Sequence, residues 1–441
     1  MTGAHDLHDL PRLNAGDMPS VWRLEHGDLP DFPPLAGTAE TDVLVIGGGF
    51  TGLSCALELA VNGARPMLVE AGPIAWGASA RNGGHACTGF APGQAGLERA
   101  LGREAARDLF DLAESGKRLI ATLQRRHGFD VHYRPGYLTC AATPRHVRVL
   151  EEDLAELERL GHGGCRLLEA EELHRNWLGT DAYHGALLDP HAGLLNPVDL
   201  CAGMARAAAG KGARIHAHTP ALMLEEMNGG IAVRTPGGGI TARRVVLAAN
   251  AQNGALWPEL APYLIPVRAC QVATTPLADI LARTVIKADV AAVTDTRLPP
   301  AYFGLTPGRR LIFGAGASYL DRPPLHVTPG IHPHLKRTFP QLSDVPIDAA
   351  WCGVMAVTAN RYPHCGRAGR SGDIWFAHGY SGQGVVLATL LGHLVARALL
   401  GDTERFELFA AIPHGPHPGG PLRAWLHAAR MAWRMIRRQP D

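Results

Sequence analysis

Two glycine-rich turns, far apart in the sequence, have the residue spacing that binds phosphate groups. The first is Gly47-Gly-Gly-Phe-Thr-Gly52 and the second is Gly379-Tyr-Ser-Gly-Gln-Gly384, and each stands between an apolar run and a helical pattern. Glycines at these spacings allow a tight turn and let the backbone approach a pyrophosphate without an intervening side chain. The N–H groups that begin the following helix would then point at the phosphates. For the first turn, the alternative is a tight loop without a ligand.

We expect the first turn to be positioned by a strand, a helix and a second strand. Residues 43–46 form the short apolar run of a buried parallel strand, and residues 51–62 follow as a helix. Residues 65–70 return as the second strand and end in Glu70. A carboxylate at that place accepts a hydrogen bond from a ribose 2′-hydroxyl and repels a 2′-phosphate. The unit therefore predicts a dinucleotide that lacks a 2′-phosphate.

The second turn lies so far downstream that it can meet the first only in space. Residues 372–378 predict a strand before it, and residues 385–400 predict an apolar helix after it. Together the two turns would hold both ends of one extended cofactor. FAD explains this arrangement better than NAD, because the whole flavin nucleotide must be buried, whereas one half of a Rossmann sheet can hold NAD.

Length and composition describe a globular protein with room for two or three domains. The chain has 441 residues, of which 46% are hydrophobic and 19% are charged, and its formal net charge is +1. This balance gives no electrostatic case for binding nucleic acid. The first residues lack the basic and apolar regions of a secretory signal, and no apolar run approaches the roughly 20 residues of a membrane span. We therefore expect a cytoplasmic protein.

Cysteine and histidine spacing does not indicate a metal site. The eight cysteines are scattered without a CxxC pair, and several stand in apolar runs. We interpret them as reduced and mostly structural. The 22 histidines are dispersed, without the His-Glu-x-x-His or paired-cysteine spacing of common zinc sites. We predict no bound metal.

The order of the patterns predicts an α/β fold. A Rossmann-like nucleotide-binding domain would be interleaved with a substrate domain that contains a β-sheet, and the resemblance given below implies that the first is an FAD-binding domain of the glutathione-reductase type. Residues 96–127 and 144–160 have helical periodicity, and residues 133–141 have the pattern of a strand. We expect an extended N-terminal arm (1–40), a discontinuous FAD-binding domain (41–92, 191–265 and 348–401), a substrate domain (93–190 and 266–347) and a C-terminal extension with an amphipathic helix (402–441).

Five segments, in the same order, resemble the D-amino-acid oxidase superfamily of flavoproteins. They are the first glycine turn with Glu70, Gly77-x-Ser-x-Arg-Asn-Gly-Gly84, Leu194-x-Asn-Pro197, residues 245–251 and the second glycine turn. Within the superfamily, the chain is most similar to the γ-glutamylputrescine oxidoreductase branch, through Trp76-Gly-Ala-Ser79 and Asn360-Arg-x-Pro363. Ala80 and His85 depart from that branch, which usually has glycine and often has glutamine at these positions.

The resemblance implies FAD that is held without a covalent bond. Relatives that attach flavin covalently use a cysteine at the position of Gly353, and the neighbouring Cys352 should point away from the flavin in a strand. The predicted cofactor-binding residues are Gly47, Gly49, Phe50, Thr51, Gly52, Glu70, Ala71, Gly77, Ala78, Ser79, Arg81, Asn82, Gly83, Gly84, Ala221, Ala249, Asn250, Gly353, Gly379, Ser381, Gly382, Gln383 and Gly384.

The resemblance also implies oxidation of a C–N bond in a small amine or amino acid, with γ-glutamylputrescine-like compounds among the candidates. Hydride would pass from the carbon beside the nitrogen to flavin N5, and water would hydrolyse the resulting imine to an aldehyde or keto acid. Sarcosine oxidases have a lysine near the flavin that assists oxygen reduction, whereas this chain has only apolar residues at the corresponding positions 311–314. The electron acceptor is therefore oxygen or another molecule.

Four side chains are candidates for the chemistry, and each has a structural alternative. Arg81 would hold the charge of the reduced flavin or of a substrate anion, or else make a pyrophosphate or structural contact. His85 would face the substrate or serve as a structural histidine. Arg361, expected in a strand, would pair with a substrate carboxylate or with neighbouring carbonyl groups and acids. Tyr380 would form a wall of the amine pocket or simply pack.

The C-terminal segment predicts a helix with one apolar stripe and several arginines elsewhere on its surface. The stripe consists of Leu422, Trp425, Leu426, Ala429, Trp433 and Ile436. We expect it to dock on its own protein or on a second subunit, and the alternative is an anionic membrane surface. Two other functions stay open from the sequence: a flavin-dependent hydroxylase, which shares the first turn, and a non-catalytic flavoprotein that docks on a membrane or a partner.

Overall fold

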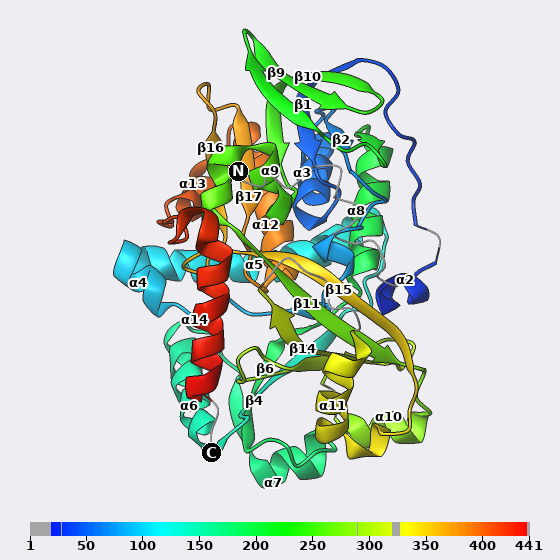
Figure 1. Ribbon diagram of the computed structural model, residues 1–441, viewed down its shortest axis with the longest axis vertical. Coiled ribbons are helices and arrows are strands. Elements are labelled where there is room, and N and C mark those ends of the chain that lie inside the picture. The colour runs from blue at the N-terminus through cyan, green and yellow to red at the C-terminus, as the bar shows by residue number, and fades with distance from the viewer. Residues whose placement is uncertain (1–18, 28, 289, 320–326, 439–441) are drawn as a thin grey trace.

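Two β-sheets with helices packed around them make up the structure (Figure 1). The computed structural model describes residues 19–27, 29–288, 290–319 and 327–438. Within these residues the first sheet has eight strands and the second has nine, and the chain passes between the sheets several times. This arrangement confirms the predicted α/β fold class.

The first sheet has a parallel centre that carries both glycine turns. Its strands are β1 (Ala39–Ile46), β2 (Met67–Val69), β7 (Arg214–His216), β8 (Met223–Met227), β9 (Gly230–Thr235), β10 (Gly238–Leu247), β16 (His364–Ala368) and β17 (Ile374–His378). Strand β1 pairs in parallel with β2 and with β10, which in turn pairs in parallel with β17. Residues 43–46 are buried between these neighbours, as predicted for a central parallel strand.

Three helices pack around the turns of the first sheet: α3 (Phe50–Val61), α8 (Pro197–Gly210) and α12 (Gly384–Leu399). Helix α3 follows the first turn and α12 follows the second, as expected. The two helices lie against each other, and the hydroxyl of Ser54 in α3 donates to the carbonyl oxygen of Thr389 in α12 at 2.7 Å. Their close packing brings the two turns to the same side of the sheet.

The second sheet is mainly antiparallel. Its strands are β3 (His85–Ala86), β4 (Arg134–Cys140), β5 (Arg166–Glu169), β6 (Gly185–Leu194), β11 (Ile265–Thr274), β12 (Ala292–Asp295), β13 (Tyr302–Leu305), β14 (Leu311–Ser318) and β15 (Ile347–Val357). Residues 348–357 therefore pair with β11 in this sheet and not with the FAD-binding sheet, where we expected them. A strand joins the sheet that offers it backbone partners, and the local residue pattern does not reveal which sheet does so.

The remaining helices lie around both sheets (Figure 1). They are α2 (Val21–Glu25), α4 (Ala95–Leu101), α5 (Arg103–His127), α6 (Pro144–Arg159), α7 (Ala170–Glu172), α9 (Asn253–Leu256), α10 (Asp279–Val285), α11 (Thr328–Thr338), α13 (Glu404–Ala410) and α14 (Arg423–Arg438). Helix α13 packs on α12 and β16 of the first sheet. The helical pattern over 96–127 is interrupted at Gly102, whose φ of +87° ends α4 and starts α5 in a new direction.

The described part of the N-terminal segment corrects the expected extended arm. Helix α2 replaces the arm over residues 21–25, although the proline-rich stretch from 29 to 37 is without helix or strand. The Trp22 side chain is fully buried, and its indole N–H donates to the carbonyl oxygen of Asn82 at 2.8 Å. Burial of this large aromatic group favours the helix over an arm that lies on the surface. Residues 1–18 of the expected arm lie outside the described residues.

A disulfide links the neighbouring strands β11 and β15. Cys270 and Cys352 are direct partners in this antiparallel pair, with their Cα atoms 4.0 Å apart. The interpretation that all eight cysteines are reduced was therefore wrong. The register of the strands brings the two thiols together, and the spacing of cysteines along the sequence does not contain that register.

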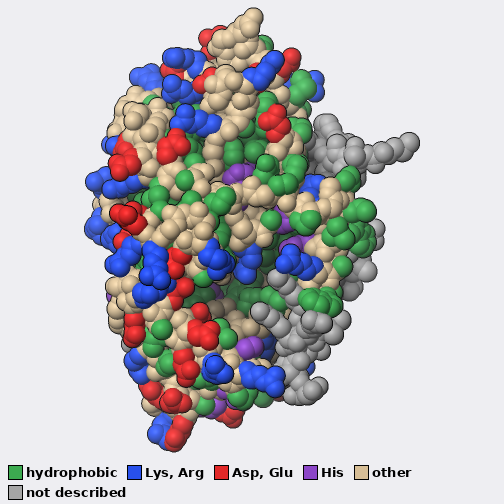
Figure 2. All heavy atoms as spheres, turned by 90° about the vertical axis from the view of Figure 1, so that its left-hand side faces the viewer, with side chains coloured by type: hydrophobic (Ala, Val, Ile, Leu, Met, Phe, Trp, Pro, Cys, Tyr) green, Lys and Arg blue, Asp and Glu red, His purple; other side chains and the backbone are tan. Residues whose placement is uncertain are grey.

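Helix α14 lies at the surface of the molecule (Figure 1), and most of its apolar stripe is exposed. The exposed fractions of Leu422, Trp425 and Trp433 are 63%, 61% and 53%, whereas Met431 on the opposite side is buried. Most of the described stripe is therefore exposed on this chain, although Leu426 lines the cavity described below, and docking on a second subunit or a membrane stays a prediction. None of the described helices combines the length and apolarity needed to cross a bilayer. Figure 2 shows basic and acidic side chains interspersed over one face, which agrees with the small net charge.

Candidate active site

A cavity of about 1180 Å³ joins the first sheet to the second. Both glycine turns line it, and so do strands β11, β14 and β15 of the second sheet. This volume lies slightly above the usual range for small-molecule and cofactor sites. The two turns therefore meet in space around one continuous cavity.

The first turn brings bare backbone to the cavity wall. A Cβ atom on Gly52 would lie 1.8 Å from the carbonyl oxygen of Gly47, which itself has a φ of +118°. A Cβ atom on Gly49 would lie 2.7 Å from Oγ of Ser79, and that hydroxyl accepts the N–H of Phe50 at 3.1 Å. Side chains at these glycines would therefore displace the turn and block the start of α3, where the N–H groups face the cavity.

Glu70 follows β2 and lines the cavity beside this turn. Its carboxylate accepts the N–H of Gly48 at 2.6 Å and the N–H of Gly72 at 2.9 Å. Burial raises the pKa of Glu70, and the hydrogen bonds from backbone N–H groups oppose that rise. The carboxylate is thus held in one orientation, with remaining acceptor capacity for a ribose hydroxyl.

The second turn is tied directly to the first. The hydroxyl groups of Thr51 and Tyr380 lie 2.6 Å apart, and the N–H of Gly379 donates to Oδ1 of Asn250 at 3.1 Å. Asn250 follows β10 and has a φ of +49°. Tyr380 therefore connects the two turns, in addition to lining the cavity.

The loop over residues 76–84 lines the cavity between the two sheets. Arg81 holds this loop in place, because its guanidinium donates to the carbonyl oxygens of Trp76 at 3.2 Å and Cys352 at 3.3 Å. The same guanidinium lies 5.0 Å from the centre of the Trp76 ring. These contacts favour a structural role for Arg81, one of the alternatives considered from the sequence.

Most of the predicted cofactor-binding residues line the cavity. They are Gly47, Gly49, Phe50, Thr51, Glu70, Ala71, Gly77, Ala78, Ser79, Arg81, Asn82, Gly83, Ala221, Ala249, Asn250, Gly353, Ser381, Gly382, Gln383 and Gly384. Gly52, Gly84 and Gly379 stand behind the wall, where a Cβ atom would meet Gly47, Leu195 and Thr358, respectively. These three positions make the turns possible and do not reach the cavity, and the contacts of the whole set with a cofactor stay predictions.

His85 forms an aromatic cluster with two tyrosines at the second sheet. Its ring meets the rings of Tyr137 and Tyr302 edge to face, with centroids 5.4 Å and 5.7 Å away, and Nδ1 lies 3.3 Å from the Tyr137 hydroxyl. Burial lowers the pKa of His85 to about 4, so the imidazole is neutral near pH 7. Nε2 is buried and has no hydrogen-bond partner among the described residues. All three side chains line the cavity.

The two tyrosines were missed in the sequence. Tyr302 fits because β14 has a glycine opposite it: a Cβ atom on Gly314 would lie 2.1 Å from the tyrosine ring. Tyr137 lies in the predicted strand over 133–141, and the alternation of that strand would have placed it on one face. The pattern alone does not show which face borders a ligand.

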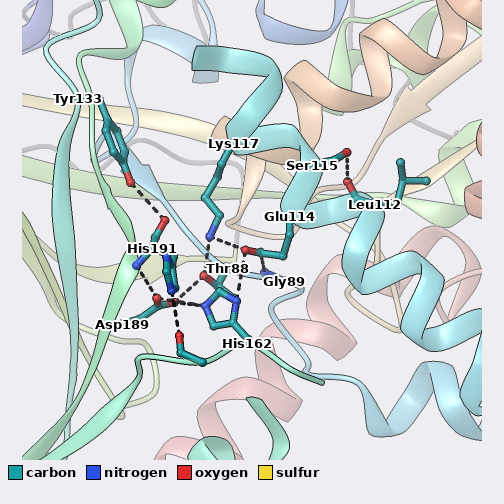
Figure 3. A network of polar contacts seen from close by, with 11 residues as sticks. Thr88, Gly89, Leu112, Glu114, Ser115, Lys117, Tyr133, His162, Asp189 and His191 are labelled. Carbon is teal, nitrogen blue, oxygen red and sulfur yellow. Dashed lines mark hydrogen bonds and ion pairs between the residues drawn. The ribbon is translucent and has the colours of Figure 1, made fainter. Parts of the chain in front are cut away.

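A polar network supports the segment that follows His85 (Figure 3). Thr88 donates to Asp189 at 2.6 Å and accepts from Lys117 at 2.8 Å, and Lys117 forms an ion pair with Glu114 at 2.7 Å. His162 lies between the two carboxylates, 3.2 Å from Asp189 and 3.6 Å from Glu114. Burial alone would raise the pKa of Asp189, but hydrogen bonds from His162 and Thr88 lower it. The network joins α5 and β6 to the wall behind the aromatic cluster.

Two residues of this network and a nearby cysteine could together hold a metal ion, although we predicted no bound metal. Ligand atoms of His162, Cys165 and Asp189 lie within 4.8 Å of one another. The Asp189 oxygens already accept hydrogen bonds from the His191 N–H and from the Thr88 hydroxyl. These hydrogen bonds engage the Asp189 carboxylate, and the expectation of no bound metal stays a prediction.

Arg361 lies at the other end of the cavity, in a turn between β15 and β16 with a φ of +67°. The expectation of a strand at this position was wrong, because the chain reverses direction here and the N–H of Arg361 donates to the carbonyl oxygen of Thr358. The inner face of α14 lines the same region with Arg423, His427 and Arg430. Sequence reasoning assigned none of these three residues to a site.

Comparison with known proteins decides the family. A family profile described as "DAO: FAD dependent oxidoreductase" matches residues 42–398 of this chain. The chain belongs to this family. Gamma-glutamylputrescine oxidoreductase of Escherichia coli (strain K12) is 37% identical over 390 residues, which cover 88% of this chain and 90% of the relative. Glycine oxidase of Bacillus licheniformis is 26% identical over 84% of this chain and 96% of its own length.

A solved structure confirms the fold of this DAO-family member. Glycine oxidase from Bacillus cereus ATCC 14579 aligns with a TM-score of 0.70 and 21% identity, covering 85% of this chain and 99% of the other. Membership of the family confirms that the chain is an FAD-dependent oxidoreductase and therefore an enzyme. Its relatives are named for amine and amino-acid substrates.

The residues present fit FAD. The cradle of bare backbone at the first turn and the oriented carboxylate of Glu70 suit the adenosine and pyrophosphate part, and the second turn with loop 76–84 suits the isoalloxazine part. Gly353 lines the cavity, whereas the neighbouring Cys352 is turned to its disulfide with Cys270. The expected direction of Cys352 is confirmed, and this arrangement supports FAD held without a covalent bond.

Proposed function

We propose that this enzyme oxidises a C–N bond in a small linear amine of the γ-glutamylputrescine type. The observation that carries the proposal is the continuity of the cavity, which extends from the dinucleotide turns to the cluster of His85, Tyr137 and Tyr302. When bound, FAD would take a hydride from the carbon beside the amine nitrogen. The work left to the protein is to place that carbon and to receive the amine in a reactive form.

The aromatic cluster is suited to placing an amine. The electron-rich faces of Tyr137 and Tyr302 attract an ammonium group as it enters. His85, neutral because burial lowers its pKa to about 4, offers Nε2 for a hydrogen bond to the nitrogen. A neutral imidazole does not repel the incoming cation, and at pH 7 it does not keep the proton that the amine must lose. We therefore assign His85 the role of holding the amine nitrogen, with the released proton passing to solvent.

The relatives support a terminal amine of a longer molecule as the substrate. The enzyme named for γ-glutamylputrescine is 37% identical to this chain, whereas the glycine oxidase is 26% identical. The cavity also extends well beyond the aromatic cluster, as far as Arg361 and α14. A substrate as small as glycine would leave that region empty.

Anaerobic mixing of the holoenzyme with single amines tests the proposal. We expect γ-glutamylputrescine to bleach the flavin absorbance faster than putrescine, glycine or sarcosine at equal concentration. His85→Phe should slow the bleaching roughly tenfold, the value of one lost hydrogen bond to a charged or polarised group. His184→Gln changes an exposed histidine of the second sheet region and serves as the control. If no amine bleaches the flavin, the proposal fails, and bleaching by NADPH alone would indicate a hydroxylase.

A further inference from the structure

We propose that the inner face of α14 binds a carboxylate at the far end of the amine substrate. The proposal rests on the proposed function, because it names the group opposite the oxidised amine. Arg423, His427 and Arg430 stand four and three residues apart, so they share one face of the helix, and all three line the cavity. The C-terminal extension is thereby part of the substrate site.

The charges that line the cavity differ between its two ends. Among the described lining residues Glu70 is the one carboxylate, and it stands at the dinucleotide turn. The opposite end contains Arg361, Arg423 and Arg430. A cavity wall with more cationic than anionic side chains attracts an anion.

Tyr319 relates the region of Arg361 to helix α14. The ring of Tyr319 lies 5.3 Å from that of His427 in α14, and the charge of Arg361 partly offsets the rise that burial causes in the pKa of Tyr319. Within the described part of the chain, neither Arg423 nor Arg430 forms an ion pair with a carboxylate. The guanidinium of Arg423 donates to the carbonyl oxygens of Leu264 at 3.5 Å, just before β11, and of Gly420 at 3.3 Å. Arg430 is an exposed residue that lines the cavity.

The phosphates of bound FAD would not account for these arginines. The pyrophosphate part of FAD fits the first turn, where the backbone N–H groups that begin α3 serve as donors. That turn belongs to the first sheet, whereas α14 contacts β11 of the second sheet. The arginines of α14 are therefore available to the substrate.

The length of strand β11 gives the distance between the aromatic cluster and α14. Gln271 pairs with Gly314, which pairs with Tyr302, so Gln271 marks the level of the aromatic cluster. Gln271, Ala269 and Val267 alternate along the strand, and all three line the cavity. From Gln271 to Val267 the strand advances roughly 13 Å, at about 3.3 Å per residue.

The Val267 end of this stretch of β11 lies at the level of His427. Arg268 pairs with Ser318, the residue before Tyr319, and Tyr319 contacts His427. His427 stands between Arg423 and Arg430 on the inner face of α14. A carboxylate held by these arginines would thus lie roughly 13 Å from the amine, a span of about ten single bonds in an extended chain. The apolar Val267 and Met355 between the two ends suit methylene groups.

A matched pair of amines tests this assignment on the holoenzyme. γ-Glutamylputrescine has a carboxylate about ten bonds from its terminal amine, and N-(4-aminobutanoyl)putrescine is the same chain without that carboxylate. We expect Arg430→Gln to raise KM for the first compound roughly tenfold with little change in kcat, and to leave KM for the second unchanged. Arg430→Lys should restore part of the loss. Arg103→Gln, an exposed arginine at the start of α5, is the control.

Binding of a compound that cannot be oxidised separates this proposal from the proposed function. γ-Glutamylbutylamide has the carboxylate and no terminal amine, and its binding is followed by the shift it causes in the flavin absorbance spectrum. We expect Arg430→Gln to weaken this binding roughly tenfold, even if no amine in the panel reduces the flavin. Equal KM changes for both amines of the matched pair, or equal binding of γ-glutamylbutylamide by wild type and Arg430→Gln, would overturn the assignment.

Discussion

The two ends of the cavity are built from different parts of the chain. At the dinucleotide end, backbone N–H groups and glycines of two short turns form the wall. At the opposite end, which here means the region from the aromatic cluster to α14, side chains from β4, β13, β14 and α14 form the wall. These segments are far apart in sequence. A wall of backbone needs only the right turn, whereas a wall of side chains needs strand register and helix orientation as well.

This difference separates the binding of the cofactor from the binding of the substrate. Every member that binds FAD has the same dinucleotide to accommodate, and backbone donors do so without regard to most side chains. Substrates differ between members, and side chains on strands and on a terminal helix change without disturbing the turns. We therefore expect mutations at the two ends to have separable effects on flavin content and on substrate use.

The largest effect is expected at Gly52. Its Cβ position is 1.8 Å from the carbonyl oxygen of Gly47, so Gly52→Ala forces the first turn and α3 apart. We expect a loss of about 3 kcal/mol in the free energy of unfolding, together with loss of bound flavin. Flavin absorbance per protein and thermal unfolding measure the two changes. Gly210→Ala in α8, where a Cβ atom meets nothing within 4 Å, should change neither, and full flavin content in Gly52→Ala would contradict the account.

A smaller effect on the same end is expected from Glu70→Gln. The amide retains the shape of the carboxylate but has only one acceptor oxygen. In the wild type, the two oxygens accept the N–H groups of Gly48 and Gly72. We expect the affinity of the apoenzyme for FAD to fall roughly tenfold to a hundredfold, as for a lost hydrogen bond to a charged group. Titration of the apoenzyme with FAD, followed by flavin fluorescence, measures this change. KM for the amine should stay the same once flavin is saturating, and a change confined to KM would refute the assignment.

The opposite end should respond in the reverse way. Tyr302→Leu removes the aromatic ring that fills the space above Gly314 and faces His85. We expect KM for the amine to rise roughly tenfold while flavin content stays at the wild-type level, since the lost aromatic contacts concern the substrate. Tyr302→Phe keeps the ring and should remain close to wild type in steady-state kinetics. Loss of flavin in Tyr302→Leu would show that the two ends are not separable.

The smallest effect concerns pH and His85. Burial lowers its pKa in the folded protein to about 4 from the ordinary value of 6.5, so the unfolded chain takes up a proton that the folded chain does not. Stability therefore falls as pH decreases from about 6.5 toward 4. Between pH 8 and pH 6 His85 should account for about 0.8 kcal/mol of this loss. Denaturant unfolding at both pH values should show a smaller loss in the free energy of unfolding for His85→Gln than for the wild type. An equal loss in both proteins would mean that the imidazole is in contact with water.

Sequence patterns predicted the dinucleotide end well because its determinants are local. The strand, the glycine turn, the helix and Glu70 follow one another within one short segment, and each has its own residue preference. The second turn and the direction of Cys352 followed from the same kind of local rule. FAD and the family followed from several such segments in order.

The substrate end was predicted poorly because long-range pairing builds it. The disulfide between Cys270 and Cys352 depends on the register of β11 against β15, and burial of Trp22 depends on a loop that comes later in the chain. The apolar periodicity of α14 did not show which of its residues reach the cavity. Met431 and the ring of His427 pack inward beside Leu426, and Arg423 and Arg430 line the cavity with them.

The order of strands in the first sheet has a consequence for synthesis of the chain. Strand β1 can pair with β2 soon after both are synthesised, because they are close in sequence. Its other neighbour, β10, and the second glycine turn are synthesised much later. Residues that line the cavity extend from Ile46 to Met431. Nearly the entire polypeptide must therefore leave the ribosome before the flavin pocket is complete, so FAD binding follows translation. A nascent chain halted before α14 would have a pocket that is open to solvent.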